Sequence, residues 1–194
     1  MFLIPVGLIF VFFYINVQVG NHVVDILPDA VGYLLIAANA WKFRGKSDPF
    51  PNLVILSSIL AAYSMVVRLI VPTGMAGIAA SLLELILQLY LLKMIVAGVE
   101  DIGRTVGAHL NADVLNRWRL WLSGAWTAVF VCATAGALAQ WLAVVGLLVV
   151  AVWAVLCLLF LVTLFRTSHR YKLLRRFGAS TQDQEKEDDS TEET

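Results

Sequence analysis

Residues 120–165 form an unbroken stretch of 46 residues without a charged side chain. A helix rises about 1.5 Å per residue, so this stretch would be about 69 Å long, roughly twice the ~30 Å thickness of a bilayer's hydrocarbon core. It must therefore turn back on itself, and we expect two membrane-spanning helices joined by a turn near residues 136–140. A hairpin of this kind indicates an integral membrane protein.

The composition of the whole chain agrees with this class. Of its 194 residues, 60% are hydrophobic and only 14% are charged, against roughly a quarter charged in soluble proteins. The formal net charge is zero, so the chain has no overall basic character for binding nucleic acid. An open sheet edge cannot lie in lipid, and the apolar runs lack the alternation of barrel strands, so the predicted class is all-α.

The predicted fold is an integral membrane bundle of six transmembrane helices that occupies residues 1–165. The expected spans are residues 2–19, 28–43, 52–71, 75–98, 118–137 and 141–165. Residues 99–117 form a cytoplasmic connector, in which apolar residues at helical spacing favour an interfacial helix. Residues 166–178 are a basic juxtamembrane segment, and the acidic residues 179–194 are expected to be disordered because they have too little apolar surface to bury.

The distribution of Lys and Arg predicts the orientation in the membrane. Basic residues cluster between spans two and three, between spans four and five, and after span six, which all lie on one side of a six-span bundle. The opposite loops, residues 20–29, 72–74 and 136–140, contain no Lys or Arg. Because cytoplasmic loops are the ones enriched in basic residues, both termini are expected to be cytoplasmic.

Glu84 is the residue that is least expected in a membrane span. It lies nine residues into span four, about 14 Å deep at 1.5 Å per residue, near the bilayer midplane. A carboxylate at that depth must be paired, hydrated or protonated, so it is expected to face the interior of the bundle. It shares one helical face with residues at spacings of three and four, namely Gly77, Ser81, Gln88 and Leu91. This face serves either for hydrogen bonding between helices or for lining a pocket.

Arg68 is the candidate partner for a carboxylate inside the bundle. It ends a similar polar face in span three, formed with Ser57, Ala61 and Ser64. Its backbone is expected to differ in depth from that of Glu84 by about 9 Å at 1.5 Å per residue. Arg68 therefore pairs either with Glu84 or with Asp25 and Asp29, which are expected on its own side of the membrane.

The sequence from Asp25 to Tyr33, Asp-Ile-Leu-Pro-Asp-Ala-Val-Gly-Tyr, lies at the entry to span two. Pro and acidic residues are favoured in the first turn of a helix, so a structural role explains this motif. Alternatively, the two carboxylates, four residues apart, face an outward cavity and bind a cation or a cationic headgroup. Two carboxylates offer too few oxygen ligands for a metal site.

These residues, together with Phe12-Phe13-Tyr14-Ile15, Leu87-Gln88-Leu89-Tyr90 and Gly98-Val99-Glu100, give the chain a recognisable pattern. It resembles a group of small, uncharacterised bacterial polytopic membrane proteins with an Asp-(Ile/Leu)-Leu-Pro-Asp-x-x-Gly-Tyr signature near the N-terminus. The resemblance covers roughly the first hundred residues. It implies a multi-pass protein of the bacterial cytoplasmic membrane and no particular activity.

The cysteines and histidines indicate neither a metal site nor a disulfide. Cys132 and Cys157 lie in apolar runs, and His22, His109 and His169 are scattered without metal-ligand spacing. The expected depths of the two cysteines differ by about 8 Å at 1.5 Å per residue, more than a disulfide bridges. We expect free thiols and no metal or cofactor.

Two function classes remain, and neither is an enzyme, because no catalytic motif is present. The first is a protein that binds or carries a small molecule or a lipid through an outward-facing polar pocket. The binding residues expected for this pocket are Asp25, Asp29, Arg68, Glu84 and Gln88. The alternative is a non-catalytic partner or regulatory subunit of a larger membrane complex. The expected partners are membrane lipids and, for the alternative function, a second membrane protein, but no nucleic acid.

Overall fold

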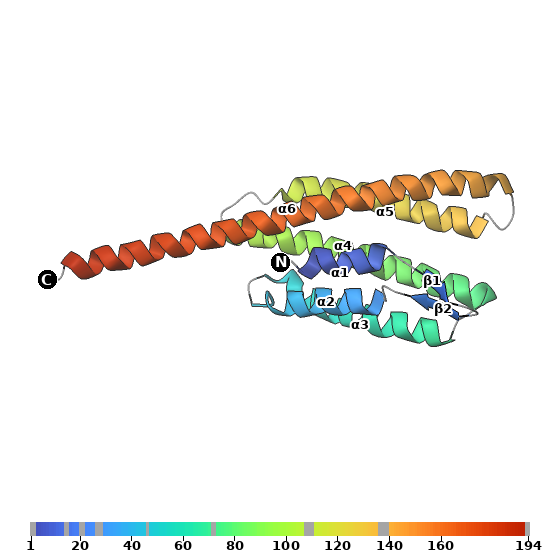
Figure 1. Ribbon diagram of the computed structural model, residues 1–194, viewed down its shortest axis with the longest axis horizontal. Coiled ribbons are helices and arrows are strands. Elements are labelled where there is room, and N and C mark those ends of the chain that lie inside the picture. The colour runs from blue at the N-terminus through green and yellow to red at the C-terminus, as the bar shows by residue number, and fades with distance from the viewer. Residues whose placement is uncertain are drawn as a thin grey trace.

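The computed structural model describes residues 3–13, 16–19, 22–25, 29–45, 47–70, 73–106, 111–135 and 140–192. Within these residues it contains a bundle of six helices and one short β-hairpin. The helices are α1 (Leu3–Phe12), α2 (Asp29–Trp41), α3 (Pro49–Ile70), α4 (Gly74–Val106), α5 (Ala112–Ala135) and α6 (Gln140–Glu192). They run roughly along one long axis, with α5 and α6 paired on one side of α4 and with α2 and α3 paired on the other (Figure 1). The predicted helical class is confirmed.

Three helices in the described part of the chain are long and apolar enough to cross a bilayer. They are α3, the segment Gly74–Thr105 of α4 and the segment Val144–Leu173 of α6. Each of them carries large apolar side chains that are exposed on the outside of the bundle, for example Leu69, Ile86 and Leu147. Because large apolar surfaces of this extent belong in hydrocarbon rather than in water, the chain is a membrane protein.

The first expected span, residues 2–19, is wrong in its second half. Helix α1 ends at Phe12, and strand β1 (Asn16–Val19) pairs antiparallel with strand β2 (His22–Asp25). The length of the uncharged run suggested one helix, but the spacing of its apolar residues changes. Val17 and Val19 alternate with polar residues, as in a strand. A Gly-Asn pair separates the strands in the sequence, and such pairs favour two-residue hairpin connections.

Helix α4 extends beyond span four into the expected connector, residues 99–117. It continues to Val106, and an ion pair of 2.6 Å between Arg104 and Glu100 links residues one turn apart in this extension. Helix α5 then begins at Ala112, earlier than the expected residue 118. Asn111 precedes it with a positive φ of 55°, a conformation that Asn tolerates better than most residues. The separate interfacial helix is therefore replaced by longer flanking helices.

Helix α6 is much longer than the expected span of residues 141–165. Its backbone is helical from Gln140 to Glu192, through the basic segment and through most of the tail that we expected to be disordered. Glu, Gln and Lys are good helix formers, and extending an existing helix costs less than nucleating a new one. In Figure 1 this C-terminal part of α6 projects beyond the other helices.

Helices α1 and α2 approach each other closely through a pair of glycines. A Cβ atom added to Gly7 would lie 2.6 Å from the carbonyl oxygen of Gly32, and one added to Gly32 would lie 2.6 Å from the carbonyl oxygen of Gly7. Small residues at a helix crossing let the two backbones pack closely in a membrane protein. This contact positions Tyr33, the neighbour of Gly32, which is completely buried.

Candidate functional site

An ion pair joins the start of α2 to the last turn of α3. Arg68 Nη2 donates a hydrogen bond to Asp29 Oδ2 over 2.9 Å. Asp29 lies in the first turn of α2 and Arg68 in the last turn of α3, where each charge also complements the helix dipole. Of the two candidate carboxylates whose side chains are described, Asp29 and Glu84, it is Asp29 that pairs with Arg68. Within the described residues, Glu84 has no ion pair.

A short hydrogen-bond network connects α2 to α4 through Gln88. Its side-chain nitrogen donates to the hydroxyl of Tyr33 over 2.7 Å and to Glu84 Oε1 over 3.2 Å. Gln88 is only 8% exposed, so both bonds lie in a low-dielectric interior where they hold the Glu84 carboxylate in place. Tyr33 was not among the expected site residues, although its spacing of four from Asp29 places both on one face of α2.

The polar face predicted for α3 does not join this network. Ser57 donates to the carbonyl oxygen of Leu53 in its own helix over 2.6 Å, a bond typical of Ser in membrane helices. A hydrogen bond between α3 and α4 comes instead from Tyr63, whose hydroxyl donates to the carbonyl oxygen of Ala80 over 2.8 Å. The face of α3 therefore stabilises the bundle, while the polar face of α4 lines a cavity.

This cavity, of about 320 Å³, lies between α1, α4, α5 and α6. Its polar lining comes from α4 and consists of Ser81, Glu84 and Gln88. The facing wall is aromatic and apolar, with Phe12 from α1, Trp126 and Phe130 from α5, and Trp153 from α6. We call this space the Glu84 cavity. Its lining combines a carboxylate from the first half of α4 with aromatic rings from three other helices.

Three of these rings pack against one another edge to face or tilted. The ring centroids are 5.6 Å apart for Phe12 and Trp126, 6.5 Å for Phe12 and Trp153, and 5.9 Å for Trp126 and Trp153. Such arrangements hold aromatic side chains in defined orientations. Sequence reasoning missed them, although one signal was present: Trp126 and Trp153 lie well inside apolar segments and not in the interfacial belts where membrane Trp residues are usually found.

Four buried side-chain polar atoms have no hydrogen-bond partner among the described residues. They are Oδ1 of Asp29, Nδ2 of Asn39, Oγ of Ser47 and Nε1 of Trp153. Buried polar groups are nearly always satisfied by protein or by another molecule. Trp153 also lines the Glu84 cavity.

The structure divides the five expected binding residues into separate groups. Glu84 and Gln88 line the cavity, whereas Asp29 and Arg68 form the ion pair between α2 and α3 and are not part of the cavity lining. Asp25 lies on strand β2, and its side chain is outside the part of the chain whose side chains are described. The single outward pocket expected from the sequence is therefore resolved into an ion pair and a neighbouring cavity.

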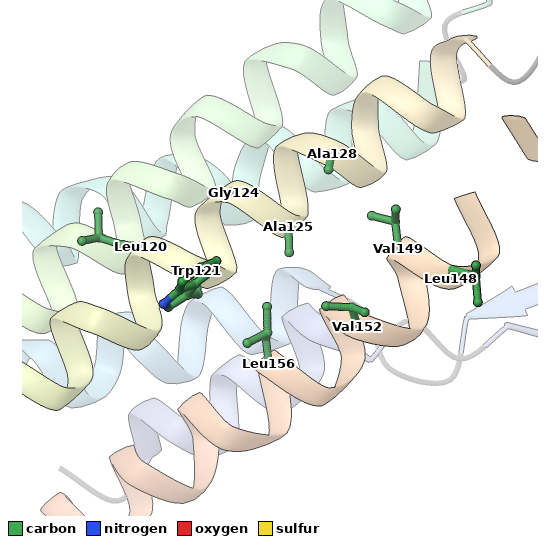
Figure 2. A pocket seen from close by; sticks show the side chains of 9 residues that line it. All are labelled: Leu120, Trp121, Gly124, Ala125, Ala128, Leu148, Val149, Val152 and Leu156. Atoms are coloured by element: carbon green, nitrogen blue, oxygen red, sulfur yellow. The ribbon is translucent and has the colours of Figure 1, made fainter. Parts of the chain in front are cut away.

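A second hollow, an open groove of about 640 Å³, runs between α5 and α6. Figure 2 shows side chains of both helices converging on it, with Trp121 on α5 near Leu156 on α6. All nine lining residues are apolar or small, and Gly124 has no neighbour that an added Cβ would meet. Its lining has no charged side chain and only the indole N–H of Trp121 as a hydrogen-bonding group, which offers little to select one ligand over another. The Glu84 cavity is therefore the candidate site.

Metal chemistry has no support in the geometry of the described side chains, since no three His, Cys, Asp or Glu residues among them gather at one point. Cys132 and Cys157 are free, which confirms the predicted thiols. The architecture defines a helical membrane protein in which a carboxylate and an aromatic wall face one partly open cavity between four helices. Comparison of the chain with known protein families, with curated proteins and with solved structures found no match.

Proposed function

We propose that this protein binds or carries a small molecule or a lipid in the Glu84 cavity. The observation that carries the proposal is the Glu84 carboxylate, which lines a partly open cavity between four helices of a membrane bundle and has no ion pair among the described residues. Ionisable groups inside a membrane are costly and usually serve a function. A volume of about 320 Å³ lies within the range of roughly 300–1,000 Å³ that is usual for ligand sites.

The two sides of the site support this assignment in different ways. The polar side is organised, because Gln88 holds Glu84 and is itself bonded to the buried Tyr33. The aromatic side offers a large apolar contact area, as ligand sites commonly do. Interhelical hydrogen bonding by itself explains Gln88 and Tyr33, but it does not explain a cavity beside the carboxylate.

We further propose that all six helices take part in crossings and that both termini face the cytoplasm of a bacterial cell membrane. Helices α1 and α2 have 10 and 13 residues, fewer than the ~20 of a complete span. Strands β1 and β2 continue both paths toward the same end of the bundle (Figure 1). Each of these two crossings then combines a helix with a strand, which is tolerated where the surrounding protein covers the backbone.

This topology predicts the side from which cysteines react. In a background without Cys132 and Cys157, Thr73→Cys, in the turn before α4, should react with an impermeant thiol reagent added to intact cells. Gly45→Cys, after α2, should react only once the cells are opened, because the basic residues around it predict a cytoplasmic location. Both positions are exposed, and an added Cβ at Gly45 meets no neighbour. The opposite labelling pattern would reverse the proposed orientation.

The proposed function predicts that the protein retains a molecule when it is purified in mild detergent. Native mass spectrometry should detect this molecule on the parent protein, and Glu84→Gln should reduce its occupancy about tenfold, since it removes the charge and keeps the shape. The matched control is Glu100→Gln, on the same helix. Glu100 forms an exposed ion pair with Arg104, and such pairs contribute little to stability.

The outcome also separates the two function classes. A retained small molecule or lipid whose occupancy depends on Glu84 supports binding in the cavity. A stoichiometric membrane-protein partner without a retained molecule contradicts this proposal and supports the alternative, a regulatory or partner subunit. Retention that is equal in the parent and in Glu84→Gln would place the molecule elsewhere on the protein.

A further inference from the structure

We propose that the Glu84 cavity selects an organic cation with apolar substituents, such as a quaternary ammonium or phosphonium compound. This inference rests on the proposed binding function and adds the chemical class of the ligand. It follows from three features of the cavity: the charge of its lining, the aromatic residues opposite that charge, and the way in which the carboxylate is held.

The charge of the lining favours a cation. Of the described residues around the cavity, Glu84 is the one that carries a charge. Arg68 is engaged with Asp29 at 2.9 Å, and these two residues together with Glu84 sum to one negative charge. An anionic ligand would meet this carboxylate across a low-dielectric space, and a neutral ligand would leave it either uncompensated or protonated. A cation compensates it.

The aromatic wall favours an organic cation over an inorganic one. Trp126 and Trp153 line the cavity together with Phe12 and Phe130. The negative face of an aromatic ring attracts a cation, Trp most strongly, and sites for quaternary ammonium groups commonly combine such rings. A metal cation instead requires several oxygen ligands, and the polar lining has only Glu84, Gln88 and Ser81. The remaining lining residues, which include Val11, Leu85 and Val129, suit apolar substituents.

The carboxylate is held with one oxygen uncommitted. Gln88 donates to Oε1 of Glu84, and no described residue donates to Oε2. Gln88 is fixed in turn by its bond to the hydroxyl of Tyr33, 2.7 Å away. Gln88 is thus a positioning residue, and Oε2 of Glu84 is the atom that meets the cation. A prearranged carboxylate loses little entropy when the ligand binds.

The test compares two ions of the same shape and opposite charge, tetraphenylphosphonium and tetraphenylborate. Equilibrium dialysis with the full-length protein in detergent should show saturable binding of tetraphenylphosphonium, at one site per chain, and only background partitioning of tetraphenylborate. Glu84→Gln should weaken phosphonium binding about tenfold or more, because it removes one partner of a desolvated charge pair. Glu84→Asp keeps the charge and should retain binding, while Glu100→Gln should match the parent.

Substitutions in the aromatic wall provide a second measurement. Trp126→Phe and Trp153→Phe keep an aromatic ring but replace the strongest cation-binding ring with a weaker one, so each should weaken phosphonium binding a few-fold. Trp121→Phe is the control, because Trp121 lines the groove between α5 and α6 and not this cavity. Thermal unfolding of each variant establishes that it is folded before binding is compared.

The failure of this inference differs from the failure of the proposed function. Equal binding of both ions, or phosphonium binding that is unchanged in Glu84→Gln, would overturn selection for cations. A neutral or anionic molecule retained by the parent through Glu84, with no phosphonium binding, would overturn the cation class and leave the binding function standing. Absence of both phosphonium binding and any retained molecule would overturn both proposals.

Discussion

Replacing Gly32 with alanine is expected to destabilise the protein by about 3 kcal/mol, the upper part of the range for overpacking a close-packed interior. The added Cβ would lie 2.6 Å from the carbonyl oxygen of Gly7, and a backbone atom cannot move aside as the end of a flexible side chain can. Helices α1 and α2 would have to separate, and Tyr33 would move with α2. Unfolding in detergent, followed by circular dichroism, measures the loss.

Gly124→Ala is the matched control for this substitution. Gly124 also lies within a helix, α5, but nothing is within 4 Å of its added Cβ. Because alanine has the higher helix propensity, this variant should be unchanged or more stable by up to about 1 kcal/mol. Gly7→Ala should match Gly32→Ala, since both disturb the same contact. Equal stability of the Gly32 and Gly124 variants would show that α1 and α2 do not pack this closely.

The ion pair between Asp29 and Arg68 is expected to couple the two residues energetically. Asp29→Asn and Arg68→Met should each cost about 1–3 kcal/mol, because each removes one side of a partly buried ion pair. The side chains are 14% and 34% exposed respectively, so the loss should be smaller than for a completely buried pair. The double variant should recover part of the loss, with a coupling energy of about 1–2 kcal/mol in a double-mutant cycle.

A second cycle, with Arg68→Met and Glu84→Gln, tests whether this coupling is specific. Glu84 forms no ion pair with Arg68, although the two charges act on each other at longer range. Its coupling to Arg68 should therefore be clearly smaller than that of Asp29. A larger coupling energy between Arg68 and Glu84 would contradict the ion pair between Asp29 and Arg68, and it would place the Arg68 side chain at the cavity.

Several parts of the candidate site were predictable from residue spacing alone. Glu84 and Gln88 are four residues apart and therefore share a helix face, and a carboxylate near the midplane was expected to turn inward. The structure places both in the lining of one cavity. Asp29 was recognised as the acidic residue at the start of a helix, which is where α2 begins.

Other parts were not predictable, because they depend on which helices meet. Phe12, Trp126 and Trp153 lie on α1, α5 and α6, and no local pattern in the sequence relates positions so far apart. The choice of Asp29 as the partner of Arg68 depends on the lateral packing of α2 against α3 and not on depth alone. The end of α1 at Phe12 was missed for another reason: apolar length measures burial and does not distinguish a helix from a strand.

The sequence by itself determined the membrane class, the helical architecture and the inward-facing carboxylate of α4, because hydrophobic length, charge content and 3.6-residue spacing are properties of consecutive residues. Only the tertiary structure decided that Arg68 pairs with Asp29, that Gly7 and Gly32 bring two backbones together, and that Glu84 faces an aromatic wall. These features are contacts between helices, and contacts between distant segments are set by how side chains fill the space between them.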